Sequence, residues 1–223
     1  MNVSIREIID ELKTIGSGRT FDALLPPLIF LIINRILDLN IAVMAALSVA
    51  VIFGAVRLWR RQNWFYALAG FIGVSLASGL AYLTQSAAGY FIPAIITSVF
   101  LLLLALMSQL KGKPLAAWAS HLTRGWPLEW FWRADIKPAY REVTWMWTGF
   151  LGLRLILQIM LFRAGEASQL TWANSLLGWP FTILVLILSY LYGIWRLRNL
   201  KGPGVEEYKQ GKEPPWDGQK KGF

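Results

Sequence analysis

The sequence contains no cysteine and only one histidine, His121, among its 223 residues. The absence of cysteine excludes disulfides, thiol nucleophiles and thiolate metal ligands. A single histidine leaves little from which to build a transition-metal site. The sequence therefore predicts neither a metal nor another cofactor.

Motifs of common catalytic sites are also missing. The chain has no His-Glu-x-x-His pair, no phosphate-binding glycine loop ending in Lys-Ser/Thr, and no Gly-x-Ser-x-Gly elbow. The run Gly16-Ser17-Gly18-Arg19-Thr20 shares only its glycines with a phosphate loop and lacks the lysine. No predicted membrane span holds two central carboxylates that would relay protons. We therefore expect a protein that is not an enzyme.

Charged residues are scarce, and the apolar residues come in long runs. Only 16% of residues are charged, against about 25% in soluble domains, and 56% are hydrophobic. Predominantly apolar runs without a charged residue cover residues 41–56 and 90–110. A run of about 18 or more apolar residues is long enough to cross the bilayer as a helix, whereas barrel strands alternate over about 10 residues. The predicted class is an all-α, polytopic membrane helix bundle.

The chain divides into three predicted regions. Residues 1–18 form an amphipathic interfacial helix, since apolar residues recur there mostly at three- and four-residue spacing among mixed charges. Residues 19–198 form the transmembrane domain, and the segment 199–223, rich in Lys, Gly and Pro, is expected to be a disordered cytoplasmic tail. A cleaved signal peptide is disfavoured because no clean cleavage site follows the first span. The six predicted spans cover residues 22–39, 40–59, 64–84, 90–110, 143–162 and 174–196.

The positions of the basic residues predict the topology. With six spans, 19 of the 22 Lys and Arg residues fall before the first span, in the 2–3 and 4–5 loops, after the last span, or at the span ends that adjoin these regions. Loops rich in Lys and Arg stay in the cytoplasm. Both termini are therefore predicted to be cytoplasmic. The basic residues on the cytoplasmic side then account for the net charge of +9, and we do not expect nucleic acid as a partner.

Several polar residues fall inside predicted spans. Arg154 lies about 11 residues into the fifth span, where an arginine costs at least about 2.5–3.5 kcal/mol, and Gln158 lies one turn further along the same face. Arg154 either serves an anion site or gate, or makes a structural interhelical bond. Arg35 either extends to the outer interface or pairs with Asp38, and Asn34 lies beside it. If Asp38 also reaches Arg154, the three residues form one polar cluster.

A tryptophan-rich segment lies in the 4–5 loop, residues 111–142. Residues 114–132 are too interrupted by charges, glycine and proline to cross the membrane, so we interpret them as a re-entrant or interfacial segment on the cytoplasmic face. One reading is a loop anchored in the headgroups, and the other is an element that gates a substrate. The candidate residues of this segment are Trp118, His121, Trp126, Trp130 and Trp132.

Small residues recur at four-residue spacing in the third span. Gly73 with Ala77, and Ser75 with Gly79, would let another helix approach closely. The pairs favour packing within the bundle, and the alternative is an interface of a homo-oligomer.

Four short motifs lie between the first span and the start of the 4–5 loop. They are Leu25-Pro26-Pro27-Leu28-Ile29-Phe30, Val56-Arg57-Leu58-Trp59-Arg60-Arg61-Gln62, Gly89-Tyr90-Phe91-Ile92-Pro93 and Lys113-Pro114-Leu115. In these motifs the chain resembles an uncharacterised bacterial family, domain of unknown function 3159. The resemblance covers about half of the chain and implies a multi-pass protein of the inner membrane in actinobacteria or related phyla, with no activity and no catalytic residue. Apolar and proline placement is also similar to intracellular septation protein A.

The sequence is compatible with two functions. The first is a small transporter, channel, or lipid- or ion-binding protein, with Arg154 lining an internal polar site. The second is a non-catalytic scaffold or accessory subunit, whose tryptophan-rich segment and third span contact partners. The bilayer itself is the one partner that the composition requires.

Overall fold

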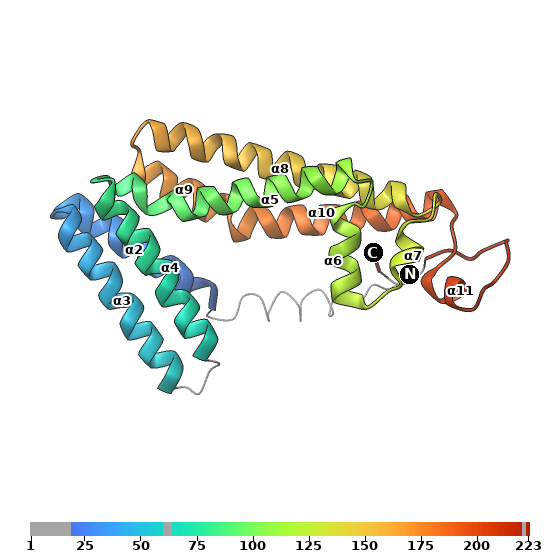
Figure 1. The fold of residues 1–223 in the computed structure, drawn as a ribbon, viewed down its shortest axis with the longest axis horizontal. Coiled ribbons are helices and arrows are strands. Elements are labelled where there is room, and N and C mark those ends of the chain that lie inside the picture. Colours follow the sequence, from blue (N-terminus) through green and yellow to red (C-terminus); the bar gives the residue numbers. More distant parts are fainter. Residues whose placement is uncertain (1–18, 60–63, 220–221) are drawn as a thin grey trace. The chain divides into compact units, whose positions relative to one another are not determined.

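The computed structural model describes residues 19–59, 64–219 and 222–223, and this part of the chain is helical without strands (Figure 1). The predicted amphipathic helix at residues 1–18 lies outside the described residues. The longer helices are α2 (Arg19–Ile36), α3 (Leu39–Trp59), α4 (Trp64–Leu83), α5 (Ile92–Leu110), α8 (Lys137–Arg163), α9 (Ala167–Leu177) and α10 (Trp179–Leu200). The shorter ones are η1 (Ala87–Phe91), α6 (Leu115–Arg124), α7 (Leu128–Phe131) and α11 (Val205–Lys209).

Four helical stretches among the described residues are long and apolar enough to cross a membrane. They are Leu39–Val56, Ala87–Leu110, Lys137–Arg163 and Ala167–Leu200. The stretches Pro26–Ile36 and Leu68–Leu83 are apolar but shorter. The all-α class is confirmed, and four of the helical stretches have the length and hydropathy of a membrane span.

The predicted sixth span, residues 174–196, has the wrong boundaries. The structure has two helices there, α9 and α10, which end and begin on either side of Gly178. Gly178 has φ −71° and ψ −123°, outside the helical region, and a Cβ at this position would lie 2.5 Å from the carbonyl oxygen of Asn174. Pro180 lies two residues after Gly178 and lacks an N–H group, so it cannot donate a backbone hydrogen bond that would join the helices. Glycine and proline together explain the break.

The turn between α2 and α3 is closed by Asp38. Its carboxylate accepts a hydrogen bond from the N–H of Ile41 at 2.9 Å, and its carbonyl accepts one from Ala42 at 3.0 Å. This is the geometry of a helix N-cap, which satisfies N–H groups that have no partner within the helix. The first predicted span therefore ends at Ile36 rather than at residue 39.

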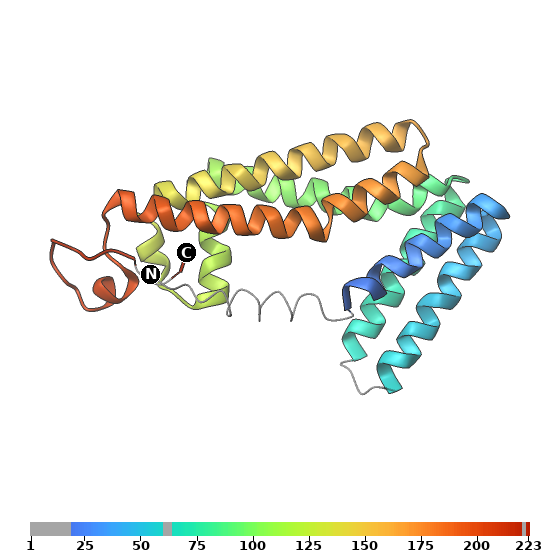
Figure 2. The same cartoon turned by 180° about the vertical axis from the view of Figure 1, so that it is seen from behind.

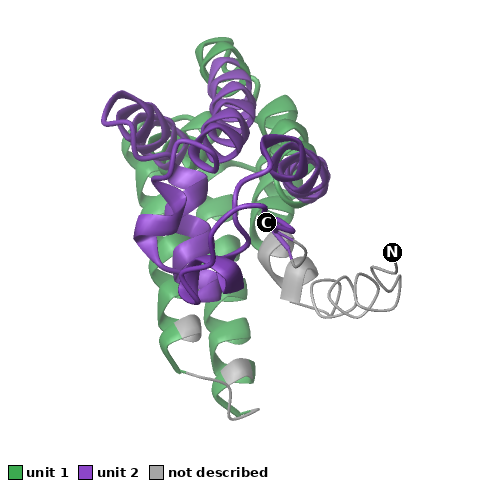
Figure 3. Ribbon diagram, turned by 90° about the vertical axis from the view of Figure 1, so that its right-hand side faces the viewer, with its two compact units in different colours: residues 1–96, 157–179 green, residues 97–156, 180–223 purple. Residues whose placement is uncertain are grey.

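The chain divides into two compact units, residues 1–96 with 157–179 and residues 97–156 with 180–223 (Figure 3). The core of the first unit contains small residues of α3 and α4, which let the two helices approach closely. Phe30 of α2 stacks on Tyr90 of η1 with ring centroids 4.4 Å apart, and both rings are buried. The small core residues are Ala42, Ala46, Ala77, Ala81 and Ala88.

The core of the second unit is an aromatic cluster, which we call the aromatic cap. It lies where α7, the first turns of α8, the end of α10 and the C-terminal segment meet, as Figure 2 shows from behind. Its rings pack mostly edge to face, a favourable arrangement for aromatic pairs. The residues of the aromatic cap are Trp126, Trp130, Phe131, Tyr140 and Phe223.

The prediction of a disordered tail at residues 199–223 is wrong for the described residues of that segment. Trp130 Nε1 donates a buried hydrogen bond to the carbonyl of Pro203 at 2.9 Å. Phe223 stacks on Tyr140 with centroids 4.3 Å apart, in a space that a Cβ at Gly193 of α10 would fill. The Lys, Gly and Pro content of the segment indicated disorder. A few apolar residues and closely approaching glycines are nevertheless sufficient for this packing.

Candidate functional site

Arg154 lies in the middle of α8 and is half-buried. Its Nε atom is buried and has no hydrogen-bond partner among the described residues. The ion pairs Arg133–Asp135 and Arg196–Glu142 involve other arginines. A guanidinium carries five donors and stays charged, so a buried donor without an acceptor is costly. The interhelical bond that the structural interpretation of Arg154 requires is not found at this nitrogen.

Gln158, one turn after Arg154 on α8, is fully buried in the first unit. Its Nε2 donates to Asn174 Oδ1 of α9 at 2.6 Å, and Asn174 Nδ2 donates to the carbonyl of Leu170 at 2.8 Å. The Oε1 atom of Gln158 is buried without a partner in the described chain. Gln158 therefore joins two helices and keeps one free acceptor. Asn174 was not predicted as a site residue, because polar residues are common at the ends of membrane spans, where they lie at the interface between lipid and water.

The residues near the end of α2 do not form the predicted pair. Arg35 and Asp38 are both exposed, and the Asp38 carboxylate caps α3 instead of bonding to Arg35. Asn34, one residue before Arg35, is partly exposed. Asp38 and Arg154 belong to different compact units, so the three-residue polar cluster stays a prediction.

The tryptophan-rich segment folds into α6 and α7, and the roles of its members differ. Trp130 is fully buried, Trp126 and Trp132 are half-buried, and Trp118 is exposed on α6. The Nδ1 atom of His121 lies 2.6 Å from the carbonyl oxygen of Trp126. Because a carbonyl only accepts, Nδ1 carries the proton in this contact. The histidine therefore closes the loop between α6 and α7.

The start of α6 is held by hydroxyl groups from two long helices. The N–H of Leu115 donates to Ser108 Oγ of α5 at 3.0 Å, and the N–H of Ala116 donates to Thr144 Oγ1 of α8 at 3.1 Å. These bonds satisfy N–H groups at the helix start, because the N-cap position is Pro114 and offers no side-chain acceptor. The beginning of α6 is thereby fixed to the ends of α5 and α8.

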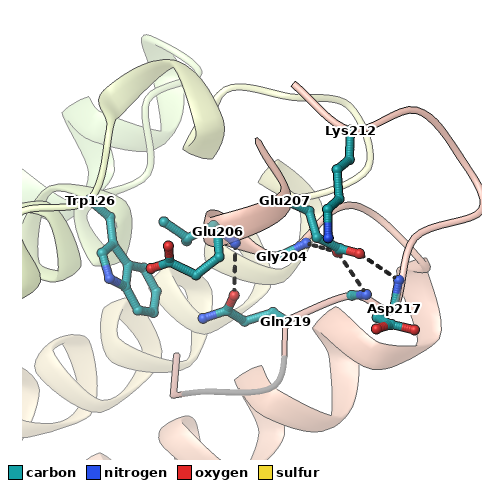
Figure 4. A pocket seen from close by; sticks show the side chains of 9 residues that line it. Trp126, Gly204, Glu206, Glu207, Lys212, Asp217 and Gln219 are labelled. Atoms are coloured by element: carbon teal, nitrogen blue, oxygen red, sulfur yellow. Dashed lines mark hydrogen bonds between the residues drawn. The ribbon is translucent and has the colours of Figure 1, made fainter. Parts of the chain in front are cut away.

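The C-terminal segment is closed by the carboxylate of Glu207, shown in Figure 4. It accepts hydrogen bonds from the N–H groups of Gly204, Asp217 and Gly218 at 2.8, 2.8 and 3.1 Å. The Gly204 bond, then the Asp217 bond, hold the pKa of Glu207 below its usual range, because these donors favour the charged carboxylate. The ionised form therefore holds this loop closed.

An open pocket of about 260 Å³ lies beside this loop, lined by Trp126 of the loop before α7 and by residues of the C-terminal segment (Figure 4). Among the described residues no group of three or more His, Asp or Glu side chains is placed to hold a metal ion. The carboxylate of Glu207 accepts hydrogen bonds from backbone donors and therefore serves the fold of the C-terminal segment. We interpret the pocket as a structural feature of this segment.

Two further contacts join α8 to α10 in the second unit. Arg196 makes a bidentate ion pair with Glu142, at 2.8 and 3.0 Å, and Tyr192 donates to the same carboxylate at 2.7 Å. Trp147 Nε1 donates to Ser189 Oγ at 3.2 Å. No sequence pattern indicates these pairs, because their members lie more than 40 positions apart. They fix the register of the two helices.

The small residues of α4 fall into two groups. Ala77 and Ser78 are buried in the first unit, which supports packing within the bundle. Gly73 is exposed, and a Cβ there would meet no atom within 4 Å. The same space is open at Gly79. No described atom therefore fills the space beside these two glycines.

Helices of this length and composition define the class of polytopic helical membrane proteins. The chain belongs to the family described as Protein of unknown function (DUF3159), which it matches over residues 16–198. No curated protein and no solved structure matches the chain, so no match links it to intracellular septation protein A.

Proposed function

We propose that the protein is a small anion transporter or channel of the bacterial inner membrane, with Arg154 lining an internal polar site. The observation that carries the proposal is the buried Nε of Arg154, which has no partner in the described chain. An arginine at membrane depth faces a partner, an ion pathway or a wet cavity. An anion supplies the missing acceptor and the missing negative charge together.

The proposed topology has six spans and both termini in the cytoplasm. It is supported by the sorting of 19 of 22 basic residues to one side and by two short apolar helices, Pro26–Ile36 and Leu68–Leu83, beside the four long stretches. Both short stretches lie within longer helices, α2 and α4.

Reporter fusions test this topology. A phosphatase, active only outside the cytoplasm, and a fluorescent protein, active inside, are fused in parallel at Ser17, Gln85 and Gly211. We expect cytoplasmic signals at Ser17 and Gly211 and an external signal at Gln85, which lies after α4. An external Ser17 with a cytoplasmic Gly211 would mean five spans and would contradict the proposal.

Replacing Arg154 with alanine tests the anion site. In proteoliposomes we expect the purified protein to conduct chloride or inorganic phosphate, and Arg154→Ala to lower this flux at least about tenfold, the effect of losing about 1.4 kcal/mol of binding. Chloride efflux is measured with an ion-selective electrode and phosphate with a radiolabel. Arg154→Lys should retain part of the flux, since it keeps the charge but loses the planar donor set.

The matched control is Arg163→Ala. Arg163 is an exposed arginine in the last turn of α8, and its loss should leave the flux unchanged. Thermal unfolding in detergent verifies that each variant is folded. Wild-type flux no greater than that of empty vesicles, or full flux in folded Arg154→Ala, would overturn the proposal.

The alternative is a non-catalytic scaffold or accessory subunit. The open, exposed position of Gly73 on α4 favours it, because a partner helix could approach the backbone there. Absent flux combined with co-purifying membrane proteins would favour this function.

A further inference from the structure

Helix α6 begins beside the ends of α5 and α8 and extends to one side of the long helices of its unit (Figure 1). Four residues link it to α5, and its start is held by Ser108 of α5 and Thr144 of α8. Figures 1 and 2 show α6 running steeply away from the axis of α5. Its 10 residues cover about 15 Å, too little to cross the bilayer. If α5 crosses the membrane, a helix in this position runs along the bilayer surface.

One face of α6 is apolar and uncovered. Ala117 and Ser120 are buried towards the aromatic cap. Trp118 is 36% exposed and Leu122 is 80% exposed. The two residues are one helical turn apart, so they share a face. Tryptophan prefers the boundary between headgroups and acyl chains, and an exposed leucine beside it gains by burial there.

Two lysines lie just before α6. The charged residues of segment 111–128 are Lys111, Lys113 and Arg124, and Glu129 follows. Lys111 and Lys113 are exposed, and Lys113 Nζ lies 5.9 Å from the ring of Trp132. The Arg124 guanidinium lies 5.0 Å from the ring of Trp126 and 5.9 Å from that of Tyr190, so it is directed towards the aromatic cap. Basic residues beside an anionic leaflet are attracted to its surface.

We propose that α6 is an in-plane anchor that binds anionic lipid. Trp118 and Leu122 enter the interface of the cytoplasmic leaflet, and Lys111 and Lys113 contact the phosphate groups of lipids such as phosphatidylglycerol. The apolar face contacts the acyl chains of the lipid, and the neighbouring cations contact its anionic headgroup. The inference rests on the proposed membrane topology but not on anion transport.

The absence of cysteine gives a direct test, because a single introduced cysteine can be labelled without background. Leu122→Cys carries an environment-sensitive NBD fluorophore in proteoliposomes of phosphatidylcholine alone or with one quarter phosphatidylglycerol. We expect blue-shifted emission, protection from an aqueous quencher, and a further gain in both with phosphatidylglycerol. The matched control is Glu129→Cys, an exposed polar position on α7, where the label should remain in water.

A second variant separates charge from insertion. Lys111→Gln with Lys113→Gln, in the Leu122→Cys background, should abolish the response to phosphatidylglycerol and keep the signal in phosphatidylcholine. A label that is quenched like the Glu129 control would overturn the anchor. Equal signals with and without phosphatidylglycerol would overturn the preference for anionic lipid. A signal that disappears when protein is diluted into excess lipid would mean that a second copy covers this face, and would also overturn it. None of these readouts depends on flux.

Discussion

Replacing Trp130 with alanine is expected to destabilise the second unit by about 3–5 kcal/mol, the usual cost of removing a buried tryptophan side chain. Trp130 is fully buried and lies 5.5 Å from Trp126 and 5.1 Å from Phe131, measured between ring centroids. Its N–H also holds the carbonyl of Pro203. Removing the side chain leaves a cavity in the aromatic cap and frees the C-terminal segment.

Two measurements check this expectation. Thermal unfolding in detergent should shift to lower temperature, and trypsin should cleave at Lys209 and Lys212 faster than in the wild type. Trp130→Phe retains much of the ring packing and loses the hydrogen bond, so its effect should be nearer 1 kcal/mol. Trp195→Ala is the control, because Trp195 belongs to the same unit on α10 and is exposed. Equal proteolysis of Trp130→Ala and Trp195→Ala would contradict the role given to Trp130.

Replacing Gly89 with alanine is expected to destabilise the first unit by about 1–3 kcal/mol, because the site is already filled. A Cβ at Gly89 would lie 2.9 Å from the carbonyl oxygen of Leu80 and 3.1 Å from Ala81 Cα, and it would also overlap Thr84 Oγ1. The threonine side chain can rotate away, but the backbone of α4 cannot move without disturbing the core. The change would shift η1 and with it the ring of Tyr90 that stacks on Phe30.

The control for this variant is another helical glycine of the same unit. A Cβ at Gly73 meets no atom within 4 Å, so Gly73→Ala should leave the stability unchanged or raise it slightly. Thermal unfolding of both variants in the same detergent, followed by tyrosine and tryptophan fluorescence, compares them directly. A Gly89→Ala protein as stable as Gly73→Ala would show that η1 tolerates the added methyl group.

The sequence predicted helices well because the signal for them is local. Runs of apolar residues place α3, α4 and α5 within a few residues of their observed ends. Contacts between distant segments carry no such signal. The hydrogen bond from Trp130 to Pro203 joins residues 73 positions apart. Pro203 belongs to the C-terminal segment, whose Lys, Gly and Pro content is typical of disorder. Its glycines permit close approach here, but composition alone cannot distinguish close approach from flexibility.

The candidate site could be predicted only as a set of positions. The depth of Arg154 and its spacing from Gln158 follow from the helical period, and both residues lie on α8. Partner choice depends on which helices pack together. Asp38 bonds to the backbone of α3 and Gln158 bonds to Asn174, and neither choice is encoded in spacing along one helix.

The break at Gly178 has a consequence for hydrophobic matching. The apolar stretch Ala167–Leu200 has 34 residues, which would extend about 51 Å as one straight helix, against a hydrocarbon thickness of about 30 Å. The 22 residues of α10 alone extend about 33 Å. If this stretch crosses the membrane once, α10 alone is long enough, whereas one helix over all 34 residues would require a strong tilt or a thicker bilayer. The break at Gly178 thus leaves α10 with a length close to the hydrocarbon thickness of the bilayer.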